Sequence, residues 1–250
     1  MDASPTKSER NAASFHPDED NVFARIAGRY DGLCDVFSLY AHRLWKSRMA
    51  QKIADHPGGL VLDVASGTGD IPLRVLRQLG TRPRAMPAKK LLVSDLCPEM
   101  LAVARSKLGP DNPAVEYAIL DAHHLREIES SSIDLFSIAF GMKICDRQRV
   151  LSEAQRVLKP GGSLFCLEAA RIPVGLVHAA YLKYMDWCLP TIARLATGGE
   201  RSAYDYLLKG IHDFPDQSAF AQEIEGFGFR DVAFENLSLG IVALHEGVKR

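Results

Sequence analysis

The sequence predicts a doubly wound α/β fold, in which helices cover both faces of a mostly parallel sheet. Short apolar runs alternate with helical hydrophobic patterns between residues 60 and 168, which is typical of strand–helix–strand units. A glycine-containing turn, Ser66-Gly67-Thr68-Gly69, follows the first apolar run directly. Aspartates stand at the ends of the first two runs, where such folds place ligand-binding side chains.

The region before the first strand is expected to be a polar arm followed by helices. Residues 1–20 are polar and mix both charges, which predicts a flexible arm. Residues 21–56 carry a helical pattern of apolar side chains that ends at Pro57-Gly58-Gly59. We therefore expect an N-terminal helical cap that precedes the sheet.

Five strands and three helices make up the expected α/β core. Pro98 suits the first turn of a helix. The segment Lys159-Pro160-Gly161-Gly162 predicts a turn before the fifth strand. The expected strands are residues 60–65, 91–95, 115–119, 133–139 and 163–168, and the expected helices are residues 71–79, 98–108 and 147–158.

The C-terminal third breaks this alternation. Residues 172–211 hold aromatic and apolar side chains and predict a helical insertion that caps the ligand edge of the sheet. A helix is expected at 217–227, followed by two strands at 230–236 and 240–246 that a short turn joins and that should pair antiparallel. Together these elements predict a single domain over residues 21–250.

Composition and charge indicate an ordinary globular protein. Hydrophobic residues make up 47% and charged residues 24%, and the net charge of −1 gives no basic surface for nucleic acid. The five cysteines form no CxxC pair, so we expect free thiols in a reducing compartment and no metal site. The sequence has neither an apolar signal core nor a run of about 18 apolar residues, which predicts a cytoplasmic protein.

The glycine turn after the first strand is the strongest candidate for a cofactor site. Gly67 and Gly69 allow a tight turn and a close approach of the backbone to a ligand, next to the free N–H groups of a helix N-terminus. A dinucleotide site would want a third glycine, and Asp63 and Asp70 would repel a pyrophosphate. Acidic residues suit a cationic ligand such as S-adenosylmethionine (SAM), so NAD is disfavoured.

Further candidate site residues follow the next strands. Asp95 ends the second strand, where an acidic residue hydrogen-bonds ribose hydroxyls in doubly wound folds. Asp121 and Ala122 follow the third strand, and Asp121 is placed to accept a hydrogen bond from an adenine amino group. Ala139-Phe140-Gly141 follows the fourth strand and should line a methyl-transfer channel.

Several motifs resemble those of class I SAM methyltransferases, and others are more specific. The segments 63–70, 95–101, 156–162 and 167–168 belong to the broad class. The more specific motifs resemble the UbiE/COQ5 family of quinone C-methyltransferases, from about residue 21 to the C-terminus. They are found at residues 22–23, 26–31, 42–46, 139–141, 204, 206–207, 215–217, 236–237 and 240–245.

The resemblance implies a fold, a methyl donor and an acceptor class. The fold is class I methyltransferase-like, a doubly wound seven-stranded sheet whose last strand is antiparallel. SAM is the implied donor, no metal is implied, and a quinol or phenolic ring is the implied acceptor. The family's SAM contacts correspond to Thr68, Asp95, Asp121, Ala122 and Ala139. With the residues described above, the expected cofactor site comprises Asp63, Ala65, Gly67, Thr68, Gly69, Asp95, Leu96, Asp121, Ala122 and Ala139.

Departures from the family pattern fall in the expected acceptor half of the site. The family's Arg-Asn pair after the fourth strand is Lys143-Ile144 here, which removes a bidentate guanidinium and a hydrogen-bonding amide. Cys34 stands where an asparagine is common, and His123 stands where an acidic residue is common. The acceptor half has therefore changed more than the SAM half.

Lys143 and Tyr30 are the candidate catalytic residues. For a ring carbon to become nucleophilic, a ring hydroxyl must lose its proton, which requires a base or a cation that stabilises the phenolate. Lys143 follows the fourth strand, where donor and acceptor should meet, and its ammonium would stabilise a phenolate. Tyr30 is the second candidate through its hydroxyl, whereas Asp31 and His42 are expected to be structural hydrogen-bonding groups.

Three hypotheses on function stay open. The first is C-methylation of a quinol ring in ubiquinone or menaquinone biosynthesis, and the second is O- or N-methylation in specialised metabolism. The third is a SAM-binding subunit with little chemistry of its own. The apolar side chains of residues 172–195 suit an isoprenoid-tailed acceptor, which would make a transient contact with a membrane surface reasonable. A homodimer is also left open.

Overall fold

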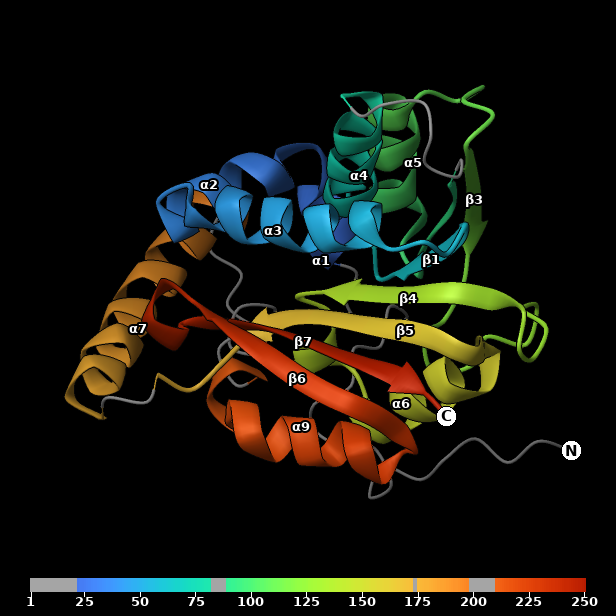
Figure 1. The fold of residues 1–250 in the computed structure, drawn as a ribbon. Helices are drawn as coiled ribbons and strands as arrows, with labels where there is room; N and C mark the ends of the chain where they lie inside the picture. Colours follow the sequence, from blue (N-terminus) through green and yellow to red (C-terminus); the bar gives the residue numbers. More distant parts are fainter. Residues whose placement is uncertain (1–21, 82–88, 173–174, 198–209) are drawn as a thin grey trace, which may run out of the picture.

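A seven-stranded sheet runs through the centre of the molecule (Figure 1). The computed structural model describes residues 22–81, 89–172, 175–197 and 210–250, so the predicted arm at 1–20 lies outside the described residues. In the described part, the strand order is β3-β2-β1-β4-β5-β7-β6. The strands are β1 Leu60–Val64, β2 Lys90–Asp95, β3 Val115–Ile119, β4 Ile133–Ala139, β5 Leu158–Ala169, β6 Phe229–Leu237 and β7 Val242–Lys249.

The pairing of the strands confirms the predicted fold class. β1 to β5 pair parallel, whereas β7 pairs antiparallel with both β5 and β6. Because β1 lies between β2 and β4, the strand order reverses at β1, and doubly wound folds bind ligands beyond the carboxyl end of such a point. The helices are α1 Val22–Ile26, α2 Tyr30–Ser38, α3 Ala41–Asp55, α4 Asp70–Gly80, α5 Pro98–Leu108, α6 Arg147–Val157, α7 Gly175–Thr197 and α9 Gln217–Gly226, with short 3₁₀ turns η1 Ala27–Arg29, η2 Met142–Ile144 and η3 Ser238–Gly240.

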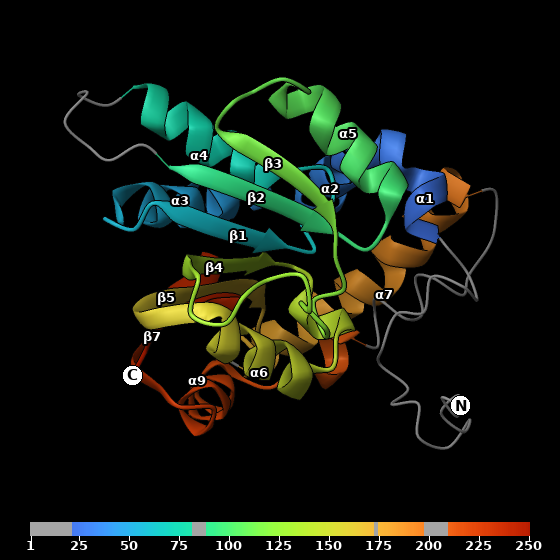
Figure 2. The ribbon, with the colours of Figure 1, turned by 90° about the vertical axis from the view of Figure 1, so that its right-hand side faces the viewer.

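Helices cover both faces of the sheet (Figure 2). One buried cluster joins α3, α4 and α5 to one face, with Met49, Val75 and Ala104 among its members. A second cluster joins α6 and α9 to the other face, with Leu151 and Phe220 among its members. The central strands are apolar on both faces, as expected for a parallel sheet that is covered on both sides.

Local polar contacts fix where several elements begin. The carboxylates of Asp146 and Asp216 cap α6 and α9 by accepting hydrogen bonds from backbone N–H groups of the first turn. Asp134 on β4 accepts hydrogen bonds from the N–H groups of Gly59 and Leu60 and pairs with Lys159 at 2.7 Å. This single carboxylate therefore aligns the start of β1 with β4 and β5.

Two local expectations differ from the structure. The segment Lys159 to Gly162 was expected as a turn, yet it lies within β5, which pairs with β4 from Leu158 onward across an irregular register. The irregularity lets Gly161, with φ of 78°, sit inside the strand. The helical pattern of 21–56 also breaks, because Leu39 and Tyr40 have φ of 48° and 65° and so separate α2 from α3.

The predicted helical insertion corresponds to α7, which spans residues 175–197. Figure 1 places α7 and α2 at the same end of the molecule, the end toward which β4 and β5 point. Residues 173–174 and 198–209 of the predicted insertion lie outside the described residues. No helix in the ranges that the structure describes is long and apolar enough to cross a membrane.

Candidate functional site

A cavity of about 610 Å³ lies at the carboxyl ends of β1, β2 and β4, beneath the cap helices α1 to α3. Its size is within the range of small-molecule sites. Of the twelve residues predicted from the sequence, eleven line this cavity. They are Tyr30, Asp63, Ala65, Gly67, Thr68, Asp95, Leu96, Asp121, Ala122, Ala139 and Lys143.

The two glycines of the turn after β1 have different roles. Gly67 has φ of 55°, lines the cavity, and would meet no atom within 4 Å if it carried a Cβ. Gly69 has φ of 75° and does not line the cavity, and its Cβ would come within 2.9 Å of the Ala104 Cβ on α5. Gly67 therefore keeps space open for a ligand, whereas Gly69 lets α4 pack closely on α5.

Asp95 holds the glycine turn in place and still faces the cavity. Its carboxylate accepts hydrogen bonds from the N–H of Gly67 at 2.7 Å and from the N–H of Cys97 at 2.8 Å. Burial raises the pKa of Asp95, and the hydrogen bonds from Cys97, Gly67 and Leu96 oppose this shift. Because a carboxylate has about four lone-pair positions, Asp95 can still accept a hydrogen bond from a ribose hydroxyl.

Asp63 lies deeper, at the floor of the cavity. It is 3% exposed, and its carboxylate accepts hydrogen bonds from the hydroxyls of Ser137 and Ser66. Burial raises the pKa of Asp63 to about 6 despite these two bonds. Asp63 is thus a desolvated carboxylate below the point where a cationic ligand would lie.

Asp121 is oriented by a histidine that sequence reasoning left without a role. His123 donates from its backbone N–H and from Nδ1 to Asp121 Oδ1, at 2.9 Å and 2.6 Å. Its Nε2 accepts a hydrogen bond from the Asp146 N–H at 2.9 Å, at the start of α6. Burial alone would raise the pKa of Asp121, but the hydrogen bonds from His123 outweigh it and lower the pKa. The residue that departs from the family pattern therefore connects the cavity to α6.

Small residues leave room on the opposite wall. Ala139 ends β4 at the cavity, and Gly141 packs so closely on Ala65 that an added Cβ would lie 2.8 Å from the Ala65 Cβ. Ala122 and Leu96 complete the wall after β3 and β2. The arrangement suits a flat ring system inserted between the strand ends.

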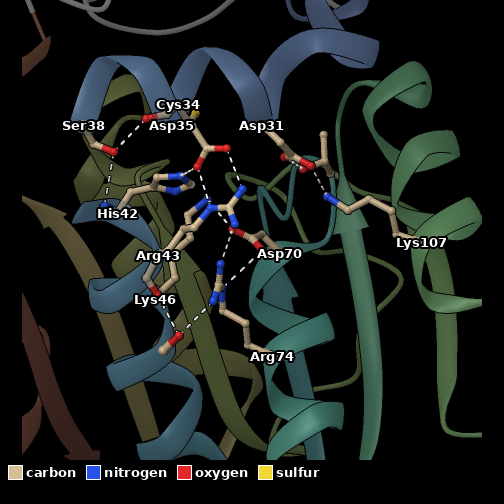
Figure 3. Close-up of polar contacts among 12 residues, drawn as sticks. Asp31, Cys34, Asp35, Ser38, His42, Arg43, Lys46, Asp70, Arg74 and Lys107 are labelled. Carbon is tan, nitrogen blue, oxygen red and sulfur yellow. Dashed lines mark hydrogen bonds and ion pairs between the residues drawn. The ribbon is translucent and has the colours of Figure 1, made fainter. Parts of the chain in front are cut away.

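The cap helices are tied to the cofactor side of the cavity by ion pairs (Figure 3). Asp31 on α2 accepts a hydrogen bond from the Thr68 hydroxyl at 2.5 Å and pairs with Lys107 on α5 at 2.5 Å. Lys46 on α3 pairs with Asp70 on α4 at 3.1 Å. The Thr68 hydroxyl therefore donates its hydrogen bond to the cap helix α2. The sequence resemblance did not reveal this role.

Lys46 is a site residue that sequence reasoning missed. It is 8% exposed and lines the cavity next to the start of α4. Burial alone would raise the pKa of its partner Asp70, but Lys46 and Arg74 lower it. Lys46 is thus a buried cation that an anionic group of a ligand can reach. Its partner is 24 residues away, so no local motif could have found the pair.

His42, predicted to be structural, belongs to a second buried network in the cap. Its Nε2 donates to Asp35 Oδ1 at 2.9 Å, and Arg43 donates two hydrogen bonds of 2.6 Å to the same carboxylate. The hydrogen bond from Arg43 lowers the pKa of Asp35 to about 2. Figure 3 shows that this network joins α2 to α3. It fixes the two helices that form the roof of the cavity.

Lys143 is buried rather than solvated. It is 7% exposed, and its Nζ lies 3.0 Å from Glu168 Oε1 on β5 and also donates to the carbonyl of Phe140. Its backbone N–H donates to the other oxygen of Glu168 at 3.0 Å. Glu168 is 1% exposed, so this ion pair is buried. An ammonium has three N–H groups, and two of them are used by these acceptors.

Tyr30 lines the cavity from the first turn of α2. Interaction with Cys34, burial, and the carboxylates of Asp95 and Asp31 raise the pKa of Tyr30 well above its usual value. The phenol is therefore protonated at neutral pH. It can donate a hydrogen bond to an acceptor oxygen, but it is poorly suited to act as a base.

The residues present fit SAM. Carboxylates at Asp63, Asp95 and Asp121 face a cavity that also holds the buried cation Lys46 and the open space at Gly67. A ligand with a positive sulfonium, a ribose diol, an adenine and a carboxylate would find a complementary group for each. Among the residues that the structure describes, no cluster of three or more histidine, cysteine, aspartate or glutamate side chains could hold a metal ion.

Comparison with known proteins decides the family. The model of the ubiE/COQ5 methyltransferase family matches residues 12–249. The chain belongs to the ubiE/COQ5 methyltransferase family. It is a SAM-dependent methyltransferase, and the resemblance of its motifs to this family is confirmed.

Similar family members come from bacteria and from mitochondria. The "Ubiquinone/menaquinone biosynthesis C-methyltransferase UbiE" of Acidiphilium cryptum is 41% identical over 231 residues, which cover 90% of this chain and 88% of that protein. The mitochondrial "2-methoxy-6-polyprenyl-1,4-benzoquinol methylase" of Schizosaccharomyces pombe is 38% identical over 242 residues, covering 92% and 78% of the two chains.

Solved structures support the fold. A SAM-dependent methyltransferase from Thermotoga maritima has a TM-score of 0.62 at 18% identity and covers 92% of this chain and 99% of its own. Another from Aquifex aeolicus has a TM-score of 0.54 at 17% identity, covering 80% and 89%. At such low identity these neighbours show the class I methyltransferase fold alone.

Proposed function

We propose that this methyltransferase transfers a methyl group from SAM to a ring carbon of a quinol in quinone biosynthesis. The observation that carries the proposal is the coincidence of eleven of the twelve predicted site residues in one cavity of a ubiE/COQ5 family member. One similar relative is named a C-methyltransferase of ubiquinone and menaquinone biosynthesis and another a benzoquinol methylase, and both align over at least 90% of this chain.

The cofactor half of the cavity is assigned to the ends of β1, β2 and β3. Asp95 is assigned to the ribose, Asp121 and Ala122 to the adenine, and Gly67 to the space beside the methionine part. Lys46 would pair with the SAM carboxylate, while Asp63 provides a negative field below the sulfonium. When bound, SAM supplies the electrophilic methyl group.

The acceptor half is assigned to the apolar wall formed by the cap and α7. Phe23, Phe37, Trp45 and Tyr181 line this part of the cavity. Such a wall excludes water from the reacting groups and accommodates an isoprenoid tail. In-line displacement needs little more than positioning, so these packed side chains would supply much of the rate.

Lys143 and Tyr30 are assigned to the oxygen of the acceptor ring. The remaining N–H of the Lys143 ammonium would donate to the ring oxygen of an acceptor whose phenolic proton has passed to water, and would stabilise the phenolate. The protonated Tyr30 phenol would donate a second hydrogen bond. The Glu168 carboxylate keeps the Lys143 side chain oriented.

Location and assembly are proposals of the same kind. A single domain over 21–250, a cytoplasmic location, and transient contact with a membrane surface are consistent with an enzyme that acts on a tailed quinol. The relative from S. pombe is named as mitochondrial. A homodimer remains a proposal that light scattering would decide.

The deciding experiment combines SAM titration with a methylation assay. Purified protein is titrated calorimetrically with SAM and then incubated with a demethylmenaquinol analogue or a 2-methoxy-6-polyprenyl-1,4-benzoquinol analogue, with the product read by mass spectrometry. A methyl gain on a ring carbon supports the proposal. Methylation of an oxygen or nitrogen would replace it with heteroatom transfer, and SAM binding without transfer to any acceptor would replace it with a SAM-binding subunit.

A matched variant sharpens this experiment. Asp95→Asn keeps the shape of the side chain but removes the charge that faces the ribose, so SAM affinity should fall about tenfold or more. Asp111→Asn, on the loop between α5 and β3, removes one carboxylate outside the cavity and serves as the control. If both variants bound SAM as the wild type does, the assignment of Asp95 would be wrong.

A further inference from the structure

Five large apolar side chains are exposed at the turns beside the cavity. Val36, Leu39, Tyr40, Leu44 and Leu239 are 58%, 76%, 60%, 74% and 83% exposed. They come from α2, the α2–α3 turn, α3 and the η3 turn between β6 and β7. Figure 1 shows α2, α7 and the β6–β7 turn at the same end of the molecule. We call these five residues the apolar lip.

A hydrogen bond links the N-terminal half of α3 to η3 beside the cavity. Trp45 Nε1 on α3 donates to the Ser238 hydroxyl at 2.8 Å. Leu39 and Ser238 both line the cavity, and Leu39 is at the same time mostly exposed. The lip therefore borders the opening through which an acceptor would enter.

The backbone of the lip is strained in order to present these side chains. Leu39, Tyr40, Ser238 and Leu239 have φ of 48°, 65°, 48° and 61°, a region that glycine and asparagine occupy with little cost. Leucine and tyrosine at such positions gain nothing in folding when they project into water. Exposed apolar groups of this kind mark a surface that is covered in use.

We propose that the apolar lip docks onto a lipid bilayer, so that an isoprenoid-tailed acceptor passes from the bilayer directly into the cavity. The inference rests on the proposed function, because a polyprenyl tail holds the quinol in the bilayer and the enzyme must reach it there. A second protein chain seated on the lip would close the opening to the acceptor. A fluid bilayer covers the same side chains and supplies the substrate.

The charges beside the lip predict how it binds. Arg43 pairs with Asp35, Arg48 with Glu235, and Lys52 with Glu246, so the basic residues of α3 in these pairs are compensated. Binding should therefore depend on apolar insertion rather than on anionic lipid. Arg43 also lies 5.3 Å from the centroid of the Tyr40 ring and would keep it at the interfacial depth that tyrosine prefers.

The test is cosedimentation of the full-length protein with vesicles of pure phosphatidylcholine. The wild type should bind, and binding should change little when phosphatidylglycerol is added or salt is raised. The Leu39→Ser/Leu239→Ser double variant should bind at least about tenfold more weakly, because two leucines no longer insert. Ile119→Ser, at an exposed position of β3 outside the lip, is the matched control and should bind as the wild type does.

Two further measurements distinguish a failure of the docking proposal from a failure of the proposed function. Melting temperature and SAM affinity show that the double variant is folded, and Leu44→Ser, on a regular helix, repeats the test without a strained turn. Methylation of a tail-less acceptor in solution should be unchanged by Leu44→Ser, whose side chain does not line the cavity, while methylation of a tailed acceptor in vesicles should show a raised KM in every lip variant. Failure of the wild type to methylate any quinol would overturn the proposed function alone.

Three results would overturn the proposed docking of the apolar lip onto a bilayer. They are a wild type that does not bind the vesicles, lip variants that bind as tightly as the wild type, and lip variants whose only change is the loss of a dimer. The last result would identify a second copy of this chain as the occupant. Equal loss of binding in Ile119→Ser would show that the effect is not specific to the lip.

Discussion

Asp63 is the residue whose ionisation most directly opposes folding. Its carboxyl is buried, and its pKa in the folded protein is about 6, above the usual value of 3.8. The folded state therefore holds the proton more tightly than the unfolded state between these two values. Stability from this group is present below about pH 4 and is lost as the pH rises toward 6.

The first prediction is that the Asp63→Asn variant loses less stability than the wild type when the pH rises. Between about pH 4 and pH 7, the free energy of unfolding should fall by up to about 3 kcal/mol less in the variant, since two pKa units correspond to roughly that amount. Urea denaturation at both pH values measures it. Carboxylates with lowered pKa values, such as Asp35 and Asp134, act in the opposite direction, so only the comparison with wild type isolates Asp63. If the free energy of unfolding changed with pH in the same way in both proteins, the raised pKa of the buried Asp63 carboxyl would be contradicted.

The second prediction separates the two glycines of the cofactor turn. Gly69→Ala should destabilise the protein by about 2–4 kcal/mol. The added methyl group would clash with Ala104, and alanine is also unfavourable in the left-handed backbone conformation of this position. Gly67→Ala should cost only about 1 kcal/mol in stability but should weaken SAM binding, because its methyl group enters the cavity. Melting and calorimetry on both variants check this, and each variant controls for the other. Similar effects on both properties in both variants would remove the distinction.

Residue identity alone could predict part of this site. Asp63, Asp95 and the glycine turn stand out in the sequence because each stands at the end of an apolar run, where doubly wound folds bind ligands. Lys46 and the Asp35 network do not stand out, because a single charged residue on a helix indicates no site until its partner is known. Glu168 belongs to a motif of the broad class, but the motif does not reveal its partner. Glu168 lies 25 residues from Lys143, and only the fold brings the two together.

At the scale of elements, the Lys143–Glu168 pair joins η2 to β5 and fixes the turn that follows β4. The third prediction concerns this pair. Lys143→Ala should cost about 3–5 kcal/mol, because Glu168 would be left buried and uncompensated. The Lys143→Met/Glu168→Gln double variant should recover most of this stability but not turnover, if the ammonium stabilises the acceptor's phenolate. Denaturation and the methylation assay are compared on the same samples, and recovered turnover would assign Lys143 a structural role only.

Element boundaries were predictable where local chemistry decides them. The bounds of α5, β3 and β4 agree with those expected from the sequence, because Pro98 and compact apolar runs define them. The break between α2 and α3 was not predictable, since leucine and tyrosine carry no preference for positive φ. There the Tyr40 N–H donates to the Asp35 carbonyl at 2.8 Å, and Arg43 is drawn to the Asp35 side chain. Tertiary contacts of this kind override the helical pattern.

For the whole molecule, the cavity lies between the sheet and the cap, so ligand binding should stabilise the complete fold. The fourth prediction is that SAM at about 100 times its dissociation constant stabilises the protein by about 2.7 kcal/mol. For a chain of this size the melting temperature should rise by about 5–10 °C. Differential scanning fluorimetry measures the shift, with NADH as the control ligand. A shift with NADH and none with SAM would contradict the assignment of the site.

The order of the sheet also bears on what the loss of one strand would do. β7 comes last among the described strands, yet it lies between β5 and β6 and pairs with both. Without Val242–Lys249, β6 and α9 have no strand that joins them to the rest of the sheet. β5 would then have an open edge and β6 would lack its neighbour, and such edges invite pairing with other chains. Truncation before the last strand should therefore yield an aggregation-prone chain rather than a slightly shortened enzyme.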